Sequence, residues 1–115
     1  MKTRSAKNKG KRLQKIVQQL LLEKTQPIGL VEGDISNTIM GQSGRDIILS
    51  PAAEKVIPFD IECKNQEKLN IWSAIQQAED NTKEGRIPML VFSKNRSKTY
   101  CVVELSKLLD LLYSK

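Results

Sequence analysis

Three charged residues alternate with apolar ones over residues 59–64, where the sequence is FDIECK. Successive side chains of a β-strand point to opposite faces, so a strand here places Asp60, Glu62 and Lys64 on one face, about 6–7 Å apart per step. The apolar side chains would then pack into the core from the other face. Carboxylates beside an ammonium group can bind a divalent cation and stabilise charge on a phosphate. An ordinary solvated sheet face can also carry such residues. The segment therefore indicates a functional site only if further residues elsewhere in the sequence complete it.

A further acidic residue, Asp46, begins the apolar run at residues 46–49, which predicts a second short strand. The connection from this run to Glu62 contains two prolines and suits an antiparallel return, which would set Asp46 beside Glu62. Two adjacent carboxylates repel each other, and each resists ionisation. Because a divalent cation relieves this repulsion, the pair predicts a metal site.

Magnesium suits this donor set, because Mg²⁺ prefers oxygen ligands, keeps several waters and uses only one or two carboxylates. We predict Asp46, Glu62 and the backbone carbonyl of Cys63 as its ligands, with Mn²⁺ as a substitute. Lys64 would then lie where it can lower the pKa of a water on the metal, orient that water or stabilise charge on a phosphate. Asp60 is expected to be an accessory ligand only.

The composition excludes several other classes of function. The 115 residues suffice for one domain and include no histidine, so a Ser-His-Asp triad, a Cys-His pair and a histidine base are absent. The two cysteines, Cys63 and Cys101, support neither a disulfide scaffold nor a zinc site. Aromatic residues make up 4%, too few for a base-stacking surface. No apolar run suits a membrane span or a signal peptide, so we expect a cytoplasmic protein.

The positive charge is concentrated near the N-terminus, where residues 1–24 contain eight basic side chains and one acidic one. A basic segment on a near-neutral domain indicates a polyanionic partner, most simply nucleic acid, although it would also serve as a solubility tail. A second basic group occupies the predicted turn at residues 93–98, which an ordinary solvated turn would explain equally well. The residues that we predict to contact DNA are Lys7, Lys9, Lys11, Arg12, Arg45, Lys94, Arg96 and Lys98.

The segment before the predicted site divides into an arm, a helix and a loop. Residues 1–10 are expected to form a flexible basic arm. From Leu13, apolar residues at i, i+3, i+4, i+7 and i+8 predict a helix that ends before Pro27. Residues 41–44 (GQSG) predict a flexible turn, and the loop at residues 38–45 is expected to order on DNA.

The remaining pattern predicts a mixed α/β fold in a single domain at residues 11–115. Asn70 is the expected N-cap of a second helix, which runs to about Thr82. The other expected elements are strands at residues 34–40, 46–49, 59–64, 89–92 and 99–103 and a helix at residues 105–112. Their order is α-β-β-β-α-β-β-α, with one sheet flanked by helices.

The sequence Gly44-Arg45-Asp46, followed after about fifteen residues by Ile61-Glu62-Cys63-Lys64, resembles the signature of the PD-(D/E)XK nuclease superfamily. The leading proline of that signature is absent. Within the superfamily, small phage endonucleases and archaeal Holliday-junction resolvases are the most similar, over residues 9–98. The resemblance implies a restriction-endonuclease-like core with a central mixed β-sheet.

The resemblance also implies roles for individual residues. Asp46 and Glu62 would hold the metal, and Lys64 would be the catalytic lysine. Gln14 stands where many resolvases have a glutamate on the first helix. It can hydrogen-bond a water on the metal but adds no negative charge, which puts a second metal in doubt. Gln77 matches a glutamine that often supports such sites.

These features together predict a Mg²⁺-dependent endodeoxyribonuclease, selective for branched DNA or Holliday junctions and acting as a homodimer in DNA recombination. A phage-encoded protein of this kind would act in the host cytoplasm. One alternative is a nuclease fold that no longer cuts and serves as a DNA-binding accessory protein, which Gln14 favours. A second alternative is a basic RNA-binding module, which the scarcity of aromatic residues disfavours.

Overall fold

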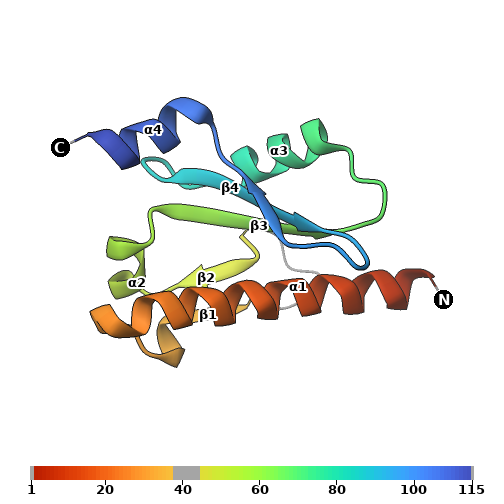
Figure 1. Cartoon of the computed structure of the whole chain (residues 1–115), viewed down its shortest axis with the longest axis horizontal. Coiled ribbons are helices and arrows are strands. Elements are labelled where there is room, and N and C mark those ends of the chain that lie inside the picture. Colours follow the sequence, from red (N-terminus) through yellow and green to blue (C-terminus); the bar gives the residue numbers. More distant parts are fainter. Residues whose placement is uncertain (1, 38–44, 115) are drawn as a thin grey trace.

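The computed structural model describes the backbone of residues 2–37 and 45–114, and the side chains of these residues from residue 8 onward. The predicted turn at residues 41–44 and most of the predicted loop at residues 38–45 lie outside the described residues. The strands lie between helix α1 (Lys2–Thr25) on one side and helix α3 (Ile71–Asp80) on the other (Figure 1).

Helix α1 runs along the length of the molecule (Figure 1). Two residues of its predicted apolar stripe, Leu13 and Val17, are buried. The stripe is only partly confirmed, because Ile16 and Leu20 are 43% and 47% exposed and the buried face includes Gln14 instead. The helix already begins at Lys2, so the structure has helical backbone where we expected a flexible arm at residues 1–10. No proline interrupts this stretch, and the single glycine in it, Gly10, costs a helix only about 1 kcal/mol relative to alanine.

In the described residues, five strands form two sheets, where the sequence predicted one central sheet. The strands are β1 (Ile35–Asn37), β2 (Ile47–Leu49), β3 (Phe59–Asn65), β4 (Ile87–Ser93) and β5 (Tyr100–Val102). β1 pairs antiparallel with β2, while β4 pairs parallel with β3 and antiparallel with β5. The two sheets are joined at Asp46, whose backbone N–H donates to the carbonyl of Ile61 at 3.1 Å. The expected single sheet is therefore split between β2 and β3.

A short helix that the sequence analysis missed, α2 (Pro51–Val56), separates β2 from β3. Its N-cap is Ser50, whose Oγ accepts the backbone N–H of Ala53 at 3.1 Å. A serine cap followed by proline in the first turn is a helix-start signal, whereas the prolines of this connection were expected only to accompany an antiparallel return. The observed order is therefore α-β-β-α-β-α-β-β-α, with 3₁₀ turns at Gln26–Ile28 and Glu32–Asp34.

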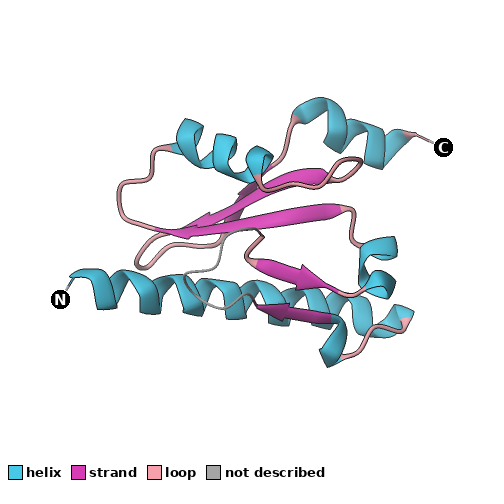
Figure 2. Cartoon of the chain, turned by 180° about the vertical axis from the view of Figure 1, so that it is seen from behind, coloured by secondary structure: helices cyan, strands magenta, loops and turns pink. Residues whose placement is uncertain are grey.

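The C-terminal half follows the prediction closely. Asn70 caps α3, since its Oδ1 accepts the backbone N–H of Ser73 at 3.1 Å, and the β4–β5 hairpin is present. Helix α4 (Leu105–Tyr113) ends the described chain and projects away from the sheets at the C-terminal end (Figure 2). None of the described helices is long and apolar enough to cross a membrane.

The main core lies between α1 and the adjoining faces of both sheets. It is built from aliphatic side chains and one buried cysteine, and its largest fully buried members include Leu13, Ile35 and Ile47. β3 contributes Ile61 and Cys63 to this core, as the alternation of its sequence predicted. The acidic residues of β3 consequently lie on the opposite face, toward α3.

Candidate active site

Asp46 lies against the edge of β3 that does not pair with β4. Its carboxylate Oδ2 accepts the backbone N–H of Cys63 at 2.7 Å, and its own backbone N–H donates to Ile61. The N–H and C=O groups of one strand residue point to the same edge of the strand. The carbonyl of Cys63 therefore faces the edge on which Asp46 lies.

Glu62 is 5% exposed and is held from two sides. The Nζ of Lys64 lies 3.8 Å from its Oε2, and the side-chain amide of Asn81 donates to its Oε1 at 3.2 Å. Because Glu62 and Lys64 are two residues apart on one strand, they share a face. The Lys64 side chain keeps 22% of its surface exposed, so the ammonium group remains within reach of a substrate.

The pKa values of both carboxyl groups are raised above their ordinary values. Burial is the largest influence on the pKa of Asp46, opposed by the hydrogen bond from Cys63 and by the positive charge of Lys64. Burial also raises the pKa of Glu62, and the negative charge of Asp46 raises it further, against the lowering effects of Asn81 and Lys64. The Asp46 carboxylate is thus close enough to disfavour the ionisation of Glu62.

This donor set fits a divalent cation that needs few protein ligands. Within residues 2–37 and 45–114, no three acidic, cysteine or histidine side chains come together. What converges is a pair of mutually repelling carboxylates beside a strand carbonyl, which matches the oxygen chemistry and low ligand count of Mg²⁺. Burial raises the pKa of the Cys63 thiol, so the contribution of Cys63 comes from its backbone.

Asp60 is not free to act as the accessory ligand that we expected. It is 2% exposed, and its Oδ1 accepts Arg86 Nε at 2.6 Å and Arg45 Nη1 at 3.1 Å. Its Oδ2 accepts the backbone N–H of Lys83 at 2.9 Å. Burial alone would raise the pKa of Asp60, but these donors together hold it below the ordinary value. Asp60 therefore anchors the start of β3.

Arg45 also differs from its predicted role. Its guanidinium points inward and pairs with Asp60 and with Glu54, at 3.3 Å from the Glu54 Oε2. A guanidinium committed to two carboxylates has less capacity to bind phosphate. We therefore assign Arg45 to positioning β3 rather than to contacting DNA.

The two predicted glutamines do not contact the acidic pair. Gln14 is 5% exposed on α1, but no hydrogen bond joins it to Asp46 or Glu62 in the described part of the chain. Gln77 is exposed on α3 and likewise has no hydrogen bond to Glu62. Asn81, four residues beyond Gln77 at the C-terminal cap of α3, makes that contact instead. The helical spacing of four residues is the signal that could have identified Asn81.

The predicted basic residues fall into separate groups. Arg12 on α1 lines one hollow together with Lys94 and Arg96 of the β4–β5 turn. Lys9 pairs with Glu67 at 3.5 Å, so its charge is partly compensated. Lys11 and Lys98 are exposed, and the side chain of Lys7 lies outside the described residues.

Comparison with known proteins supports a nuclease. The sequence profile of the family described as "Phage putative PDDEXK endonuclease" matches residues 5–115, almost the whole chain. No curated protein and no solved structure matches the chain. The superfamily that residues 44–46 and 61–64 indicated is thereby confirmed. This chain belongs to the phage PDDEXK endonuclease family.

Proposed function

We propose that the protein is a divalent-metal-dependent endonuclease that hydrolyses phosphodiester bonds of DNA. The observation that carries this proposal is the cluster formed by Asp46, Glu62 and Lys64. Burial raises the pKa values of both carboxyl groups, the charge of Asp46 raises that of Glu62 further, and an ammonium group lies 3.8 Å from Glu62. A cation can stabilise the two carboxylates, and the ammonium group can bind a phosphate. Metal-dependent hydrolysis of a phosphodiester needs both the cation and the phosphate.

Each residue of the cluster has a distinct role in the proposed mechanism. Asp46, Glu62 and the carbonyl of Cys63 would hold Mg²⁺ or Mn²⁺, which supplies Lewis-acid stabilisation of a phosphoryl oxygen when bound. The ammonium group of Lys64 stabilises negative charge that develops on the phosphate as water attacks. Asn81 donates to Oε1 of Glu62 and so orients this carboxylate, while Oε2 lies 3.8 Å from the Nζ of Lys64.

The basic residues of α1 and of the β4–β5 turn support DNA as the substrate. Arg12, Lys11, Arg96 and Lys98 are exposed, so their charges are available to phosphates. Exposed cations of this kind bind nucleic acid without reading its sequence. We therefore propose selectivity for DNA structure, such as branches and Holliday junctions, and action during recombination in the cytoplasm of a phage host.

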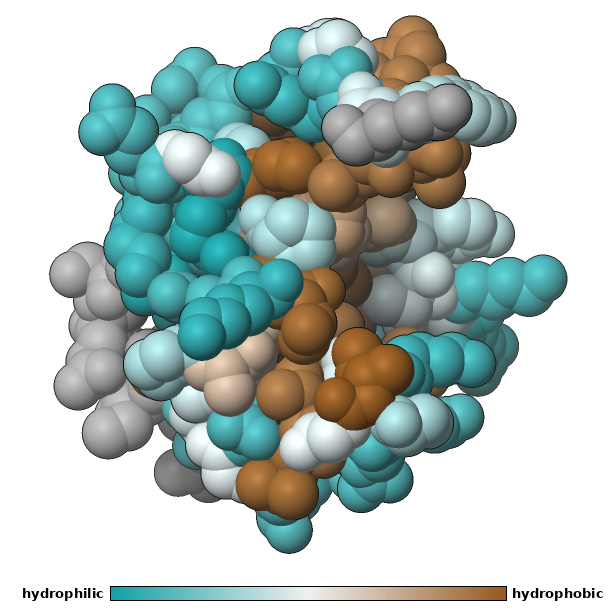
Figure 3. Space-filling view, turned by 90° about the vertical axis from the view of Figure 1, so that its left-hand side faces the viewer, coloured by the Kyte–Doolittle hydropathy of each residue, from teal (hydrophilic) through white to brown (hydrophobic). Residues whose placement is uncertain are grey.

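An exposed apolar surface supports the proposed homodimer. Every residue of α4 is exposed, including the apolar side chains of Leu105, Leu108, Leu109, Leu111, Leu112 and Tyr113. A nine-residue helix is too short to be stable alone in water. Hydrophobic residues gather at the top of the view in Figure 3, over the end of the molecule that carries α4.

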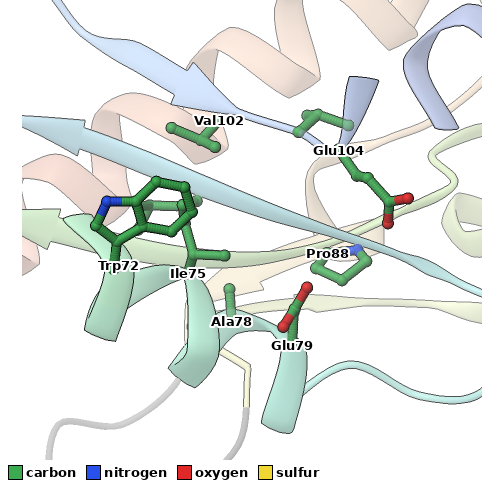
Figure 4. Close-up of a pocket in the computed structure, with 9 residues that line it drawn as sticks. Trp72, Ile75, Ala78, Glu79, Pro88, Val102 and Glu104 are labelled. Atoms are coloured by element: carbon green, nitrogen blue, oxygen red, sulfur yellow. The ribbon is translucent and has the colours of Figure 1, made fainter. Parts of the chain in front are cut away.

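An apolar groove of about 310 Å³ beside α4 supplies the complementary surface. Trp72, Ile75, Pro88 and Val102 line it, and Figure 4 shows these side chains around one hollow between α3 and the strands. In a two-fold dimer, the same groove and helix of each copy would cover those of the other. Leu112→Glu is expected to leave a monomer, as measured by light scattering after gel filtration.

The direct test is incubation with labelled duplex, flap and four-way-junction DNA, and with matched RNA, in Mg²⁺, in Mn²⁺ and in a chelator. The proposal predicts metal-dependent cleavage of DNA with 5′-phosphate and 3′-hydroxyl ends, and preference for the branched substrates. Cleavage that persists in chelator would contradict the role of the acidic pair.

The buried, neutral Gln14 favours one competing function, a nuclease fold that binds DNA without cutting it. A glutamate at this position of α1 would have added a third negative charge to those of Asp46 and Glu62. Tight binding to branched DNA without cleavage in any metal would favour this accessory role. Restoration of cleavage by Gln14→Glu would then identify Gln14 as the cause.

A further inference from the structure

A polar hollow of about 450 Å³ lies between α1 and the turn that joins β4 to β5. Helix α1 contributes Arg12, and the end of β3 contributes Asn65. The turn contributes Lys94, Arg96 and two hydroxyl-bearing side chains, and the last residue of β4 contributes a third hydroxyl group. The fold thus brings together two basic groups that are far apart in the sequence. Guanidinium, ammonium and hydroxyl groups are the side chains that hydrogen-bond phosphate oxygens.

The positive charge of the hollow is largely uncompensated. In the described part of the chain, no carboxylate lies within 4 Å of Arg12, Lys94 or Arg96. The nearby acid, Glu67, accepts the backbone N–H of Asn95 at 2.6 Å and pairs with Lys9. The charge of Lys94 also helps to lower the pKa of Glu67, so Glu67 offsets part of the charge of Lys94, whereas Arg12 and Arg96 have no such partner among the described residues. The hollow is therefore cationic and can attract an anion.

Two local features hold the basic side chains at the rim. Arg96 adopts a φ of 60°, a left-handed conformation that is costly for a residue other than glycine. On the opposite side, the amide Nδ2 of Asn65 donates to the carbonyl of Lys9 at 2.9 Å, which fixes α1 against β3 one turn before Arg12. Both sides of the hollow are thus positioned by specific backbone contacts or conformations.

The hollow and the proposed cutting site both lie at the C-terminal end of β3. Asn65, which lines the hollow, follows Lys64 directly in the strand. Because the side chains of consecutive strand residues point to opposite faces, Lys64 faces the acidic pair and Asn65 faces the hollow. A nucleic-acid strand that contacts both would have to cross this end of β3.

We infer that the hollow binds a backbone phosphate of the DNA substrate other than the phosphate that is cut. This inference rests on the proposed nuclease function, because it gives the DNA its path across the protein. The bound phosphate fixes the strand on α1 and on the β4–β5 turn, so the hollow contributes to substrate binding and not to the chemical step. It is predicted to affect KM and not kcat.

The binding test uses Arg12→Gln, Arg96→Gln and the double variant, with Lys55→Gln on the exposed face of α2 as the matched control. Affinity for a labelled four-way junction and a labelled duplex is measured in chelator over a range of salt concentrations. Each pocket variant should bind several-fold more weakly than Lys55→Gln. The slope of log affinity against log salt should also fall in magnitude by about 0.9 for each cation removed.

Two further variants separate charge from folding. Arg96→Gly removes the cation but relieves the left-handed backbone, so it should melt no lower than the wild type while binding DNA as weakly as Arg96→Gln. Arg96→Lys keeps a cation and should recover part of the lost affinity. Equal DNA affinity and equal salt slopes in the pocket variants and Lys55→Gln would overturn the inference.

The remaining outcomes distinguish this inference from the proposed function. If the wild type cleaves DNA and the pocket variants raise KM with kcat unchanged, both are supported. If the wild type cleaves no DNA, the nuclease proposal fails. The DNA affinities and salt slopes of the variants still decide whether the hollow binds a backbone phosphate. Stabilisation by inorganic phosphate without any effect of the variants on DNA affinity would assign the hollow to free phosphate. A stronger effect of the variants on matched RNA than on DNA would assign it to RNA, and either result overturns the inference.

Discussion

The Asp46 carboxylate accepts a hydrogen bond from the backbone N–H of Cys63, with 2.7 Å between the two atoms. This contact joins the residue before β2 to the free edge of β3. It sets the first acidic residue beside Glu62 and Lys64, at the point where the two sheets meet. Asp46 is therefore held by backbone groups of β3, whereas Glu62 is held by the side chains of Lys64 and Asn81.

Lys64→Ala is expected to lower the rate of DNA cleavage by about 10²–10³, because it removes the cation that stabilises charge on the phosphate. Side-chain contacts to the core are not lost, so the melting temperature should stay close to that of the wild type. Single-turnover cleavage at saturating DNA measures the effect, with Lys55→Ala on the exposed face of α2 as the control. Cleavage by Lys64→Ala at the rate of this control would refute the assigned role.

Asp46→Asn should keep the hydrogen bond from Cys63 through its carbonyl oxygen but lose the negative charge that attracts a metal. Magnesium at about 100 times its dissociation constant should stabilise the wild type by about 2.7 kcal/mol. The variant should show little or no such rise in melting temperature and no metal-dependent cleavage. An identical Mg²⁺-induced shift in both proteins would show that the metal lies elsewhere.

The raised pKa values of Asp46 and Glu62 set the sign of the pH dependence in metal-free protein. A carboxyl group whose folded pKa lies above its unfolded pKa binds more protons when folded, so stability falls as pH rises through the interval between them. Denaturant titration of the wild type from pH 4 to pH 7 in chelator should show this loss, and Asp46→Asn should reduce it. Saturating Mg²⁺ should reduce this loss of stability at neutral pH. A stability that increases over the same range in chelator by the same amount in both proteins would contradict the assignment.

Asn81→Ala should weaken the metal response by about 10–100-fold, because Glu62 loses the donor that orients it. Titration of the melting temperature and of cleavage with Mg²⁺ measures this change. In chelator, Asn81→Asp should destabilise the protein more than Asn81→Ala does, since it places a third carboxylate beside the metal-free pair. Gln77→Ala, one helical turn earlier and exposed, is the control. A metal response in Asn81→Ala equal to that of Gln77→Ala would exclude the positioning role.

Asp60→Asn should destabilise the protein by about 3 kcal/mol at neutral pH, because Arg86 and Arg45 lose their buried partner. The lowered pKa of Asp60 means that its contribution is present above its unfolded value and is lost as the pH falls through the folded one. Stability of the wild type should therefore fall more steeply than that of Asp60→Asn below about pH 3.8, the ordinary value. Glu79→Gln, exposed on α3, is the control for charge removal. Equal acid sensitivity of Asp60→Asn and the wild type would contradict this role.

Local sequence patterns were sufficient to place the strands and most of the helices. Alternation over residues 59–64 predicted which side chains face the core, and Asn70 predicted the start of α3. Such patterns can be read from a sequence because strand and helix periods depend on the backbone alone. Helix α2 was missed because the prolines of the connection were interpreted only as support for an antiparallel return, although Ser50 and Pro51 together also mark a helix start.

The side-chain partners required the tertiary structure. Asp60, Glu62 and Lys64 share one face of β3, and nothing in their spacing reveals that Asp60 alone is enclosed by Arg86 and Arg45. Sequence spacing likewise does not reveal that Asn81 contacts Glu62 or that Arg12 lies beside the β4–β5 turn. The backbone period decides to which side of a strand or helix a residue points. The packing of distant segments decides which partners the side chain meets on that side. For this reason Asp60 is a structural anchor, whereas Glu62 is a candidate metal ligand.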